Sequence, residues 1–174
     1  MQWVDELQAA TGWQGPRYET KWTVTEAELG VALPADYKEM VTRFGPGQFS
    51  SFFNVLLDDN GGTDSLLSLW RRLRSDRDRN PSLVAHVFDR YDVYLPGGKG
   101  GLIPWGGSER GNHYWLADDS SDSAEWPIVV QRDDFLKYDM STAEFMYRVI
   151  ADSKFKPITI ADPAWPPTFH PKGK

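Results

Sequence analysis

The clearest pattern of apolar and polar positions along the chain lies between residues 25 and 47. Four apolar residues recur at the i, i+3, i+4 and i+7 spacing of one helical face, namely Tyr37, Met40, Val41 and Phe44. Pro34 suits the first helical position, where its missing N–H is not needed, and Asp36 favours the positive end of the helix dipole. The sequence Gly-Pro-Gly at 45–47 ends the pattern. We therefore predict a helix whose apolar face belongs to the core.

Two further helices are indicated by capping residues. Thr25 and Glu28 have the spacing of a capping box, in which each side chain satisfies the exposed amide of the other residue. Ser141 and Glu144 form a second such pair. The second pair is followed by four apolar residues at helical spacing: Phe145, Met146, Val149 and Ile150. We predict a helix that begins at Thr25 and a last helix that follows Ser141.

The middle of the chain alternates between strand and helix patterns. Residues 49–57 are rich in aromatic and branched side chains and predict a strand, which the polar turn at 58–62 ends. Residues 66–74 place their large apolar side chains on one helical face. The basic run RRLRSDRDR at 71–79 contains two aspartates and indicates a solvated helix end rather than a phosphate site. Residues 83–95 favour a strand through their β-branched and aromatic content.

The second half of the chain is dominated by strands. Glycines on both sides of residues 102–105 predict a short strand between sharp turns. Residues 113–117 and 128–131 predict two more strands. The predicted elements run in the order helices, strands and a terminal helix. This order predicts an α+β fold with a central, mostly antiparallel sheet flanked by helices. We expect one domain over residues 1–156 and an extended or loosely packed, proline-rich tail over residues 157–174.

The composition removes several classes of function. The 174 residues include no cysteine, which excludes a disulfide scaffold, a cysteine-ligated zinc site and a cysteine nucleophile. Three histidines without HExxH-like spacing give no support for a metal site, and we expect no metal and no cofactor. The net charge of −6 argues against nucleic-acid binding. The start MQWVDELQAA does not resemble a signal peptide and the apolar runs are short, so we expect a cytoplasmic protein without membrane contact.

Three features that invite a catalytic interpretation have simpler explanations. The glycine-rich stretch 97–107 lacks the order GxxxxGK[ST] and leads into a strand, so it does not predict a phosphate loop. His113 lies inside a strand pattern and no GxSxG elbow is present, which favours a packed or half-exposed histidine over a general base. Adjacent carboxylates point apart and stay solvated, unlike the facing pair of a glycosidase; such pairs are Asp58-Asp59, Asp118-Asp119 and Asp133-Asp134. We expect no enzyme, and a carbohydrate-active enzyme is the least favoured alternative.

The remaining candidate is the acidic loop DDSSDSAE at 118–125. Its carboxylates belong to four residues, Asp118, Asp119, Asp122 and Glu125. Glu109 and Arg110 stand a short distance upstream. An ordinary polar loop is one interpretation. The functional interpretation is a negative patch that steers a basic protein partner, because complementary charge raises association rates.

Four segments occur in an order that resembles a known superfamily: LGVALPADYKEMVTRFGPGQF, GGLIPWGGSERGNHYWLADD, WPIVV and STAEFMYRVI. Together they are similar to the SUKH superfamily, the Smi/Knr-like family of a yeast cell-wall-synthesis regulator and of many bacterial immunity proteins. The match is close to the actinobacterial branch. It spans about residues 25–150, although residues 57–96 match only in general character.

The resemblance implies an α+β fold without catalytic residues. It marks six positions as fold determinants: Leu33, Pro34, Tyr37, Trp105, Gly106 and Trp115. It also implies a protein partner, since bacterial members typically bind and block a toxin, and an acidic surface suits the basic cleft of a nuclease. We expect an immunity protein whose toxin-facing surface includes the acidic loop with Glu109 and Arg110. The alternative is a regulatory scaffold that binds a cellular partner, as the yeast relative suggests.

Overall fold

A computed structural model describes residues 2–57, 65–82, 90–118, 122–157, 163 and 165–172 of the chain. Within these ranges the helices are α1 (Gln2–Thr11), α2 (Thr23–Leu29), α3 (Ala35–Phe44), α4 (Leu66–Arg79), the 3-10 turn η1 (Ser123–Glu125) and α6 (Thr142–Ala151). The strands are β1 (Gly47–Phe49), β2 (Phe53–Val55), β3 (Gly101–Ser108), β4 (Gly111–Ala117), β5 (Ile128–Gln131), β6 (Phe135–Tyr138) and β7 (Phe169–Pro171).

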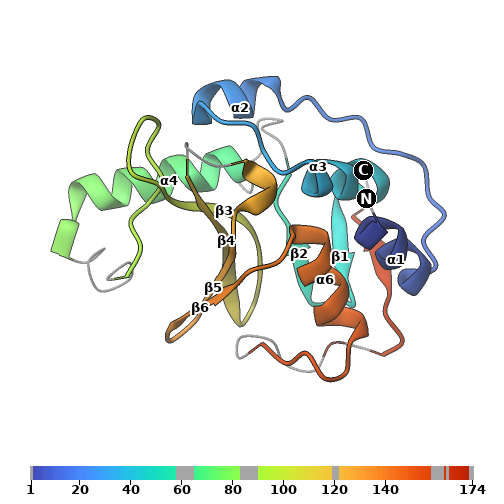
Figure 1. Cartoon of the computed structure of the whole chain (residues 1–174). Helices are drawn as coiled ribbons and strands as arrows, with labels where there is room; N and C mark the ends of the chain where they lie inside the picture. Colours follow the sequence, from blue (N-terminus) through green and yellow to red (C-terminus); the bar gives the residue numbers. More distant parts are fainter. Residues whose placement is uncertain are drawn as a thin grey trace.

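The seven strands of the described residues form one sheet. Its order is β6-β5-β4-β3-β2-β1-β7, and each neighbouring pair of strands is antiparallel. Helices lie on both sides of it (Figure 1): α1, α3 and α6 contact one another on one side, and α4 contacts β3 on the other. The predicted α+β class, with a mostly antiparallel sheet flanked by helices, is therefore confirmed.

Large aromatic side chains fill the space between the sheet and the helices α3 and α6. Trp105 of β3 and Trp115 of β4 are fully buried on this face. Phe145 of α6 stands edge-on to Trp105, with 6.0 Å between ring centroids. Tyr37 of α3 meets Trp115 in the same way at 4.7 Å. Since each such ring removes a large apolar area from water, these contacts hold both helices against one face of the sheet.

One carboxylate connects the N-termini of α3 and α6. Asp36 Oδ1 accepts a hydrogen bond from the Tyr37 N–H at 2.8 Å, and Asp36 Oδ2 accepts one from the Ala143 N–H at 2.7 Å. These N–H groups lie in the first turns of their helices, where no intrahelical acceptor is available. Beside them, Trp115 Nε1 donates to Thr142 Oγ1 at 2.9 Å. The sheet and both helices are thus joined by polar contacts at one point.

The predicted helices at 35–44 and after Ser141 are confirmed, but the predicted start at Thr25 is wrong. The apolar stripes of α3 and α6 are buried, and the Ser141 hydroxyl caps α6 by accepting from the Glu144 N–H at 3.3 Å. Helix α2 begins two residues before Thr25, whose buried hydroxyl has no hydrogen-bond partner. Glu28 pairs with Arg71 of α4 instead of capping α2. The Glu28 side chain therefore forms an ion pair with another helix and does not cap the N-terminus of α2.

The position of Pro34 and the end of the helix predicted at 66–74 also differ from the prediction. Pro34 precedes α3 as its N-cap, one position before the predicted one. Helix α4 extends to Arg79, so the basic run lies on its C-terminal half as expected for a solvated helix end. Positive side chains near a helix C-terminus are favoured by the helix dipole, which explains the longer helix.

The single strand predicted at 49–57 is wrong, because a tight turn divides it into β1 and β2. Ser50 and Ser51 have φ angles of 49° and 55°, and the Phe52 N–H donates to the Phe49 carbonyl at 3.0 Å. Two successive left-handed residues match the twist of a hairpin. Such a turn usually contains glycine or asparagine. Because this one contains two serines, the sequence pattern did not predict it.

The strand predicted at 102–105 continues through two glycines to Ser108. The pairing of β3 with β4 shifts between Pro104 and Gly106, which is a β-bulge. A side chain at Gly106 would place its Cβ 2.8 Å from the Asn54 carbonyl oxygen of β2. Gly106 therefore permits a close approach of two strands, whereas the pattern suggested a turn. The predicted strands at 113–117 and 128–131 are confirmed as β4 and β5.

Two other predicted segments fall partly outside the described residues. This applies to residues 58–62 and to most of the stretch 83–95. Within that stretch, Val93 makes an isolated bridge to Leu102 rather than part of a strand. Within the proline-rich tail, β7 pairs with β1 and buries Phe169.

Replacing Asp36 by Ala should lower the free energy of unfolding by about 1–3 kcal/mol, since two amide groups lose their charged acceptor. Asp36→Asn keeps one acceptor oxygen and should cost less. Asp139→Ala, which removes an 81% exposed carboxylate, is the control. Urea unfolding of the four proteins gives the order. Equal stability of Asp36→Ala and the control would contradict a linking role for Asp36.

Candidate functional site

The face of the sheet turned away from α3 and α6 carries a row of polar residues. One residue from each of six adjacent strands stands in register on it, and these six residues, which we call the polar row, are His170, Gln48, Asn54, Gly107, Asn112 and Gln131. Directly paired residues in antiparallel strands point to the same side of a sheet. His170, Gln48, Asn54 and Asn112 are exposed, so the described elements leave most of the row open to solvent.

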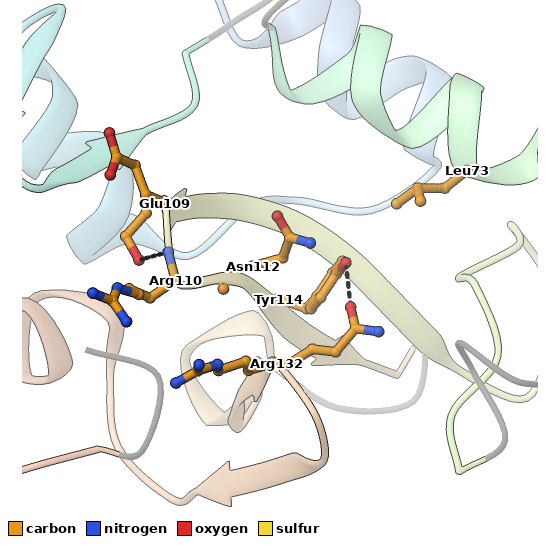
Figure 2. Close-up of a pocket in the computed structure, with 9 residues that line it drawn as sticks. Leu73, Glu109, Arg110, Asn112, Tyr114 and Arg132 are labelled. Atoms are coloured by element: carbon orange, nitrogen blue, oxygen red, sulfur yellow. Dashed lines mark hydrogen bonds between the residues drawn. The ribbon is translucent and has the colours of Figure 1, made fainter. Parts of the chain in front are cut away.

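A pocket of about 420 Å³ lies at one end of the polar row. Its lining joins Leu73 of α4, the β3–β4 turn and the end of β5 (Figure 2): Leu73, Ser108, Glu109, Arg110, Gly111, Asn112, Tyr114, Gln131 and Arg132. The buried Tyr114 hydroxyl donates to Gln131 Oε1 at 3.0 Å. Burial raises the pKa of Tyr114 far above its ordinary value, against a smaller opposing effect of its hydrogen bond with Asn112. The hydroxyl therefore stays protonated as part of a fixed polar floor.

The rim of the pocket carries two guanidinium groups and one carboxylate. Arg110 and Arg132 extend towards the same side of the pocket (Figure 2). Arg132 Nε lies 3.4 Å from a carboxylate oxygen of Asp133, and both side chains of this pair are well exposed. Among the described residues, neither Arg110 nor Glu109 forms an ion pair. Solvated charges of this kind remain available to a ligand.

The described residues of the acidic loop, 118 and 122–125, are held by two hydrogen bonds, and their three acidic residues are exposed. Trp126 Nε1 donates to the Asp118 carbonyl oxygen at 3.2 Å, and Asp122 Oδ1 accepts from the Ala124 N–H at 3.0 Å. Trp126 is buried, whereas Asp118, Asp122 and Glu125 are exposed. Asp119 lies outside the described residues. The described part of the loop thus carries exposed carboxylates at and beside η1, which contacts α3.

Five of the six residues expected to face a partner are described, and they fall into two groups. Glu109 and Arg110 precede β4, and Asp118 follows it. Seven residues of strand separate them, which corresponds to about 23 Å at the usual rise per residue. The structure therefore brings Glu109 and Arg110 together with Arg132, and places the acidic loop at the opposite end of the hairpin. Proximity in sequence was misleading because a strand of this length lies between the groups.

The residues marked by the family resemblance lie in the interior. Leu33, Pro34, Tyr37, Trp105, Gly106 and Trp115 are all buried. None of them lines the pocket or the acidic loop. Their position is compatible with a role in folding, which remains a prediction.

His113 is packed in the core, on the opposite face from the pocket. Its ring stacks on Phe53 with 4.5 Å between centroids and lies 5.6 Å from Trp105. The side chain is fully buried and neither ring nitrogen has a hydrogen-bond partner. Burial without a partner lowers the pKa of His113 to about 3. The residue is therefore neutral near pH 7 and is a packed histidine, as predicted.

The described acidic residues offer no facing pair in the pocket. Glu109 is the one carboxylate in its lining. Asp133 and Asp134, at the β5–β6 turn, have side chains that are 89% and 70% exposed. Glycosidase chemistry requires two carboxyl groups across a sugar, so this pocket lacks the arrangement. Among the described residues, no helix is long and apolar enough to cross a membrane, and no group of three or more acidic or histidine side chains is placed to hold a metal ion.

Sequence reasoning missed most of the polar row and part of the pocket. Asn54 stands as a single polar residue between apolar ones, whereas Asn112, between Gly111 and His113, offers no comparable local signal. Gln48 and His170 are far apart in the chain and become neighbours only because β7 pairs with β1. The row is a product of strand register, which local patterns do not specify across such distances.

The comparison with known protein families gave one match. The model of the SMI1 / KNR4 family (SUKH-1) matches residues 19–154. The matched span contains α2 to α6 and six of the strands, and it leaves out α1 and β7. No curated protein and no solved structure matches the chain significantly.

Acid should destabilise the protein through His113. In the unfolded chain the His113 imidazole has its ordinary pKa near 6.5, whereas in the folded chain its pKa is about 3. Between these values the unfolded state binds a proton that the folded state does not, so the free energy of unfolding decreases as the pH falls through this range. From pH 7 to pH 5 the loss amounts to about 2 kcal/mol. Urea unfolding at pH 7, 6 and 5 should show a shallower pH dependence for His113→Phe. The exposed His170→Gln variant is the control, and parallel curves for wild type and His113→Phe would contradict this account.

Proposed function

The chain belongs to the SMI1/KNR4 family (SUKH-1), and on this premise we propose that it is a bacterial immunity protein that binds and neutralises a cognate toxin. The family consists of non-catalytic SUKH-type domains and suggests protein–protein interaction. Inhibition then proceeds by occlusion: the bound domain covers the toxin's active site and no bond is made or broken. Turnover is not required.

The observation that supports this proposal is the exposed, anchored acidic loop on a chain of net charge −6. Asp118, Asp122 and Glu125 project into solvent while Trp126 holds the loop against the core. A toxin that degrades nucleic acid needs a basic cleft for its substrate. Carboxylates presented to such a cleft would compete with phosphates and accelerate encounter.

The partner can be identified by affinity purification of the tagged protein from its native host, followed by mass spectrometry. We expect a basic toxin domain, in stoichiometric amount and released by salt. Co-expression of this domain with the protein should protect cells that the domain alone kills. Recovery of cell-wall-synthesis proteins without any toxin would contradict the proposal and favour the scaffold alternative.

Charge reversal should show whether the acidic loop makes the contact. Asp118→Lys with Asp122→Lys should slow association with the recovered toxin by about tenfold or more and flatten its dependence on salt, because the steering charge is lost. Glu6→Lys with Glu19→Lys makes the same charge change at exposed positions on α1 and ahead of α2, and serves as the matched control. Stopped-flow measurements over a range of salt concentrations give the rates. Equal rates for the two double variants would remove the loop from the interface.

A further inference from the structure

The polar row and the adjoining pocket take no part in the function proposed above, and they lie on the face opposite α3 and α6. We infer that this face is a binding surface for an extended segment of a protein partner, with a carboxylate of that segment seated between Arg110 and Arg132. The inference concerns a separate surface from the acidic loop. It holds whether or not the partner is a toxin.

The side chains of the polar row suit an extended backbone. Gln48, Asn54, Asn112 and Gln131 carry amide groups, which have both donors and an acceptor. In Asn112 and Gln131, part of this capacity is already used in hydrogen bonds with Tyr114. An extended peptide presents the same two kinds of group along its length, and main-chain hydrogen bonds are a general basis of peptide recognition. From β7 to β5 the row crosses five strand-to-strand intervals, about 24 Å, which is the length of about seven extended residues. The surface is therefore long enough to hold a peptide rather than a single side chain.

Gly107 adds no side chain to the middle of the row. It stands between Asn54 and Asn112 in the register of the sheet. A Cβ at this position would lie 3.0 Å from the Gly111 carbonyl oxygen and would project from the open face. Without a side chain, the sheet can be approached closely at this point.

The end of the row selects for negative charge. Two guanidinium groups, those of Arg110 and Arg132, meet one carboxylate, that of Glu109, in the pocket lining. Arginine binds carboxylates with paired, charge-assisted hydrogen bonds, and Leu73 closes the pocket with an apolar wall. A second copy of the chain is a poorer occupant, because each copy carries a net charge of −6.

The test uses a displayed library of random heptapeptides, selected against the full chain. Peptides bound by the wild-type protein should be enriched in Asp or Glu, and a library without these two residues should give no binders. Arg110→Glu with Arg132→Glu should weaken binding of the selected peptides by at least about tenfold. Both arginines are exposed turn residues, so these changes should leave the urea midpoint unaltered. Arg72→Glu, at an exposed arginine of α4 outside the pocket, is the control.

The contact itself can be read from the side-chain amide signals of the polar row in NMR spectra. Gln48, Asn54, Asn112 and Gln131 should shift with a selected peptide. Failure to enrich acidic peptides, or equal binding by the Arg110/Arg132 double variant, would overturn the inference. Sedimentation that shows a dimer disrupted by the double variant would overturn it in favour of a second copy. Toxin binding that depends on the acidic loop, together with failure to enrich acidic peptides, would leave the proposed function standing while the inference falls.

Discussion

The Asp36 carboxylate is the point on which the arrangement of the helices depends. It accepts hydrogen bonds from the backbone amides of Tyr37 in α3 and of Ala143 in α6, and Ala143 lies 107 residues after Asp36 in the sequence. Each helix N-terminus needs an acceptor and carries partial positive charge, so one carboxylate satisfies both requirements at once. The neighbouring Tyr37 ring reaches Trp115 of the sheet, and its hydroxyl bonds to the Leu56 carbonyl. The position of α3 therefore sets that of α6, and both are fixed to the sheet.

This arrangement gives the sheet two unlike faces. On the face covered by α3 and α6, aromatic rings pack so closely that even the imidazole of His113 is held without a hydrogen-bond partner. On the other face, α4 contacts β3, and the polar row towards β7 stays exposed. An antiparallel sheet carries polar residues on the part of a face that is left to solvent. The covered face accounts for stability, and the open face is where a partner has room.

The β3–β4 hairpin separates two surfaces of opposite character. Its turn carries Arg110 beside Arg132, and its far end leads into the acidic loop. Because the hairpin lies in the middle of the sheet, both surfaces are held by rigid elements. The net charge of −6 is a sum over the whole chain and does not show that acidic and basic residues lie at opposite ends of the hairpin. The two surfaces can therefore be changed independently by substitution.

The sequence by itself determined the helices α3 and α6, the strands β4 and β5 and the α+β class. Each of these depends on periodicity or capping within a few residues, and such local signals are present in the chain. Only the tertiary structure decided that Glu28 pairs with Arg71, that Ser50 and Ser51 form a turn, and that Glu109 lies far from Asp118. It also decided that Gln48 and His170 share one face of the sheet. These relations arise from strand register and helix docking. Both are set by burial across the whole core, so the residues adjacent in sequence carry no pattern that predicts them.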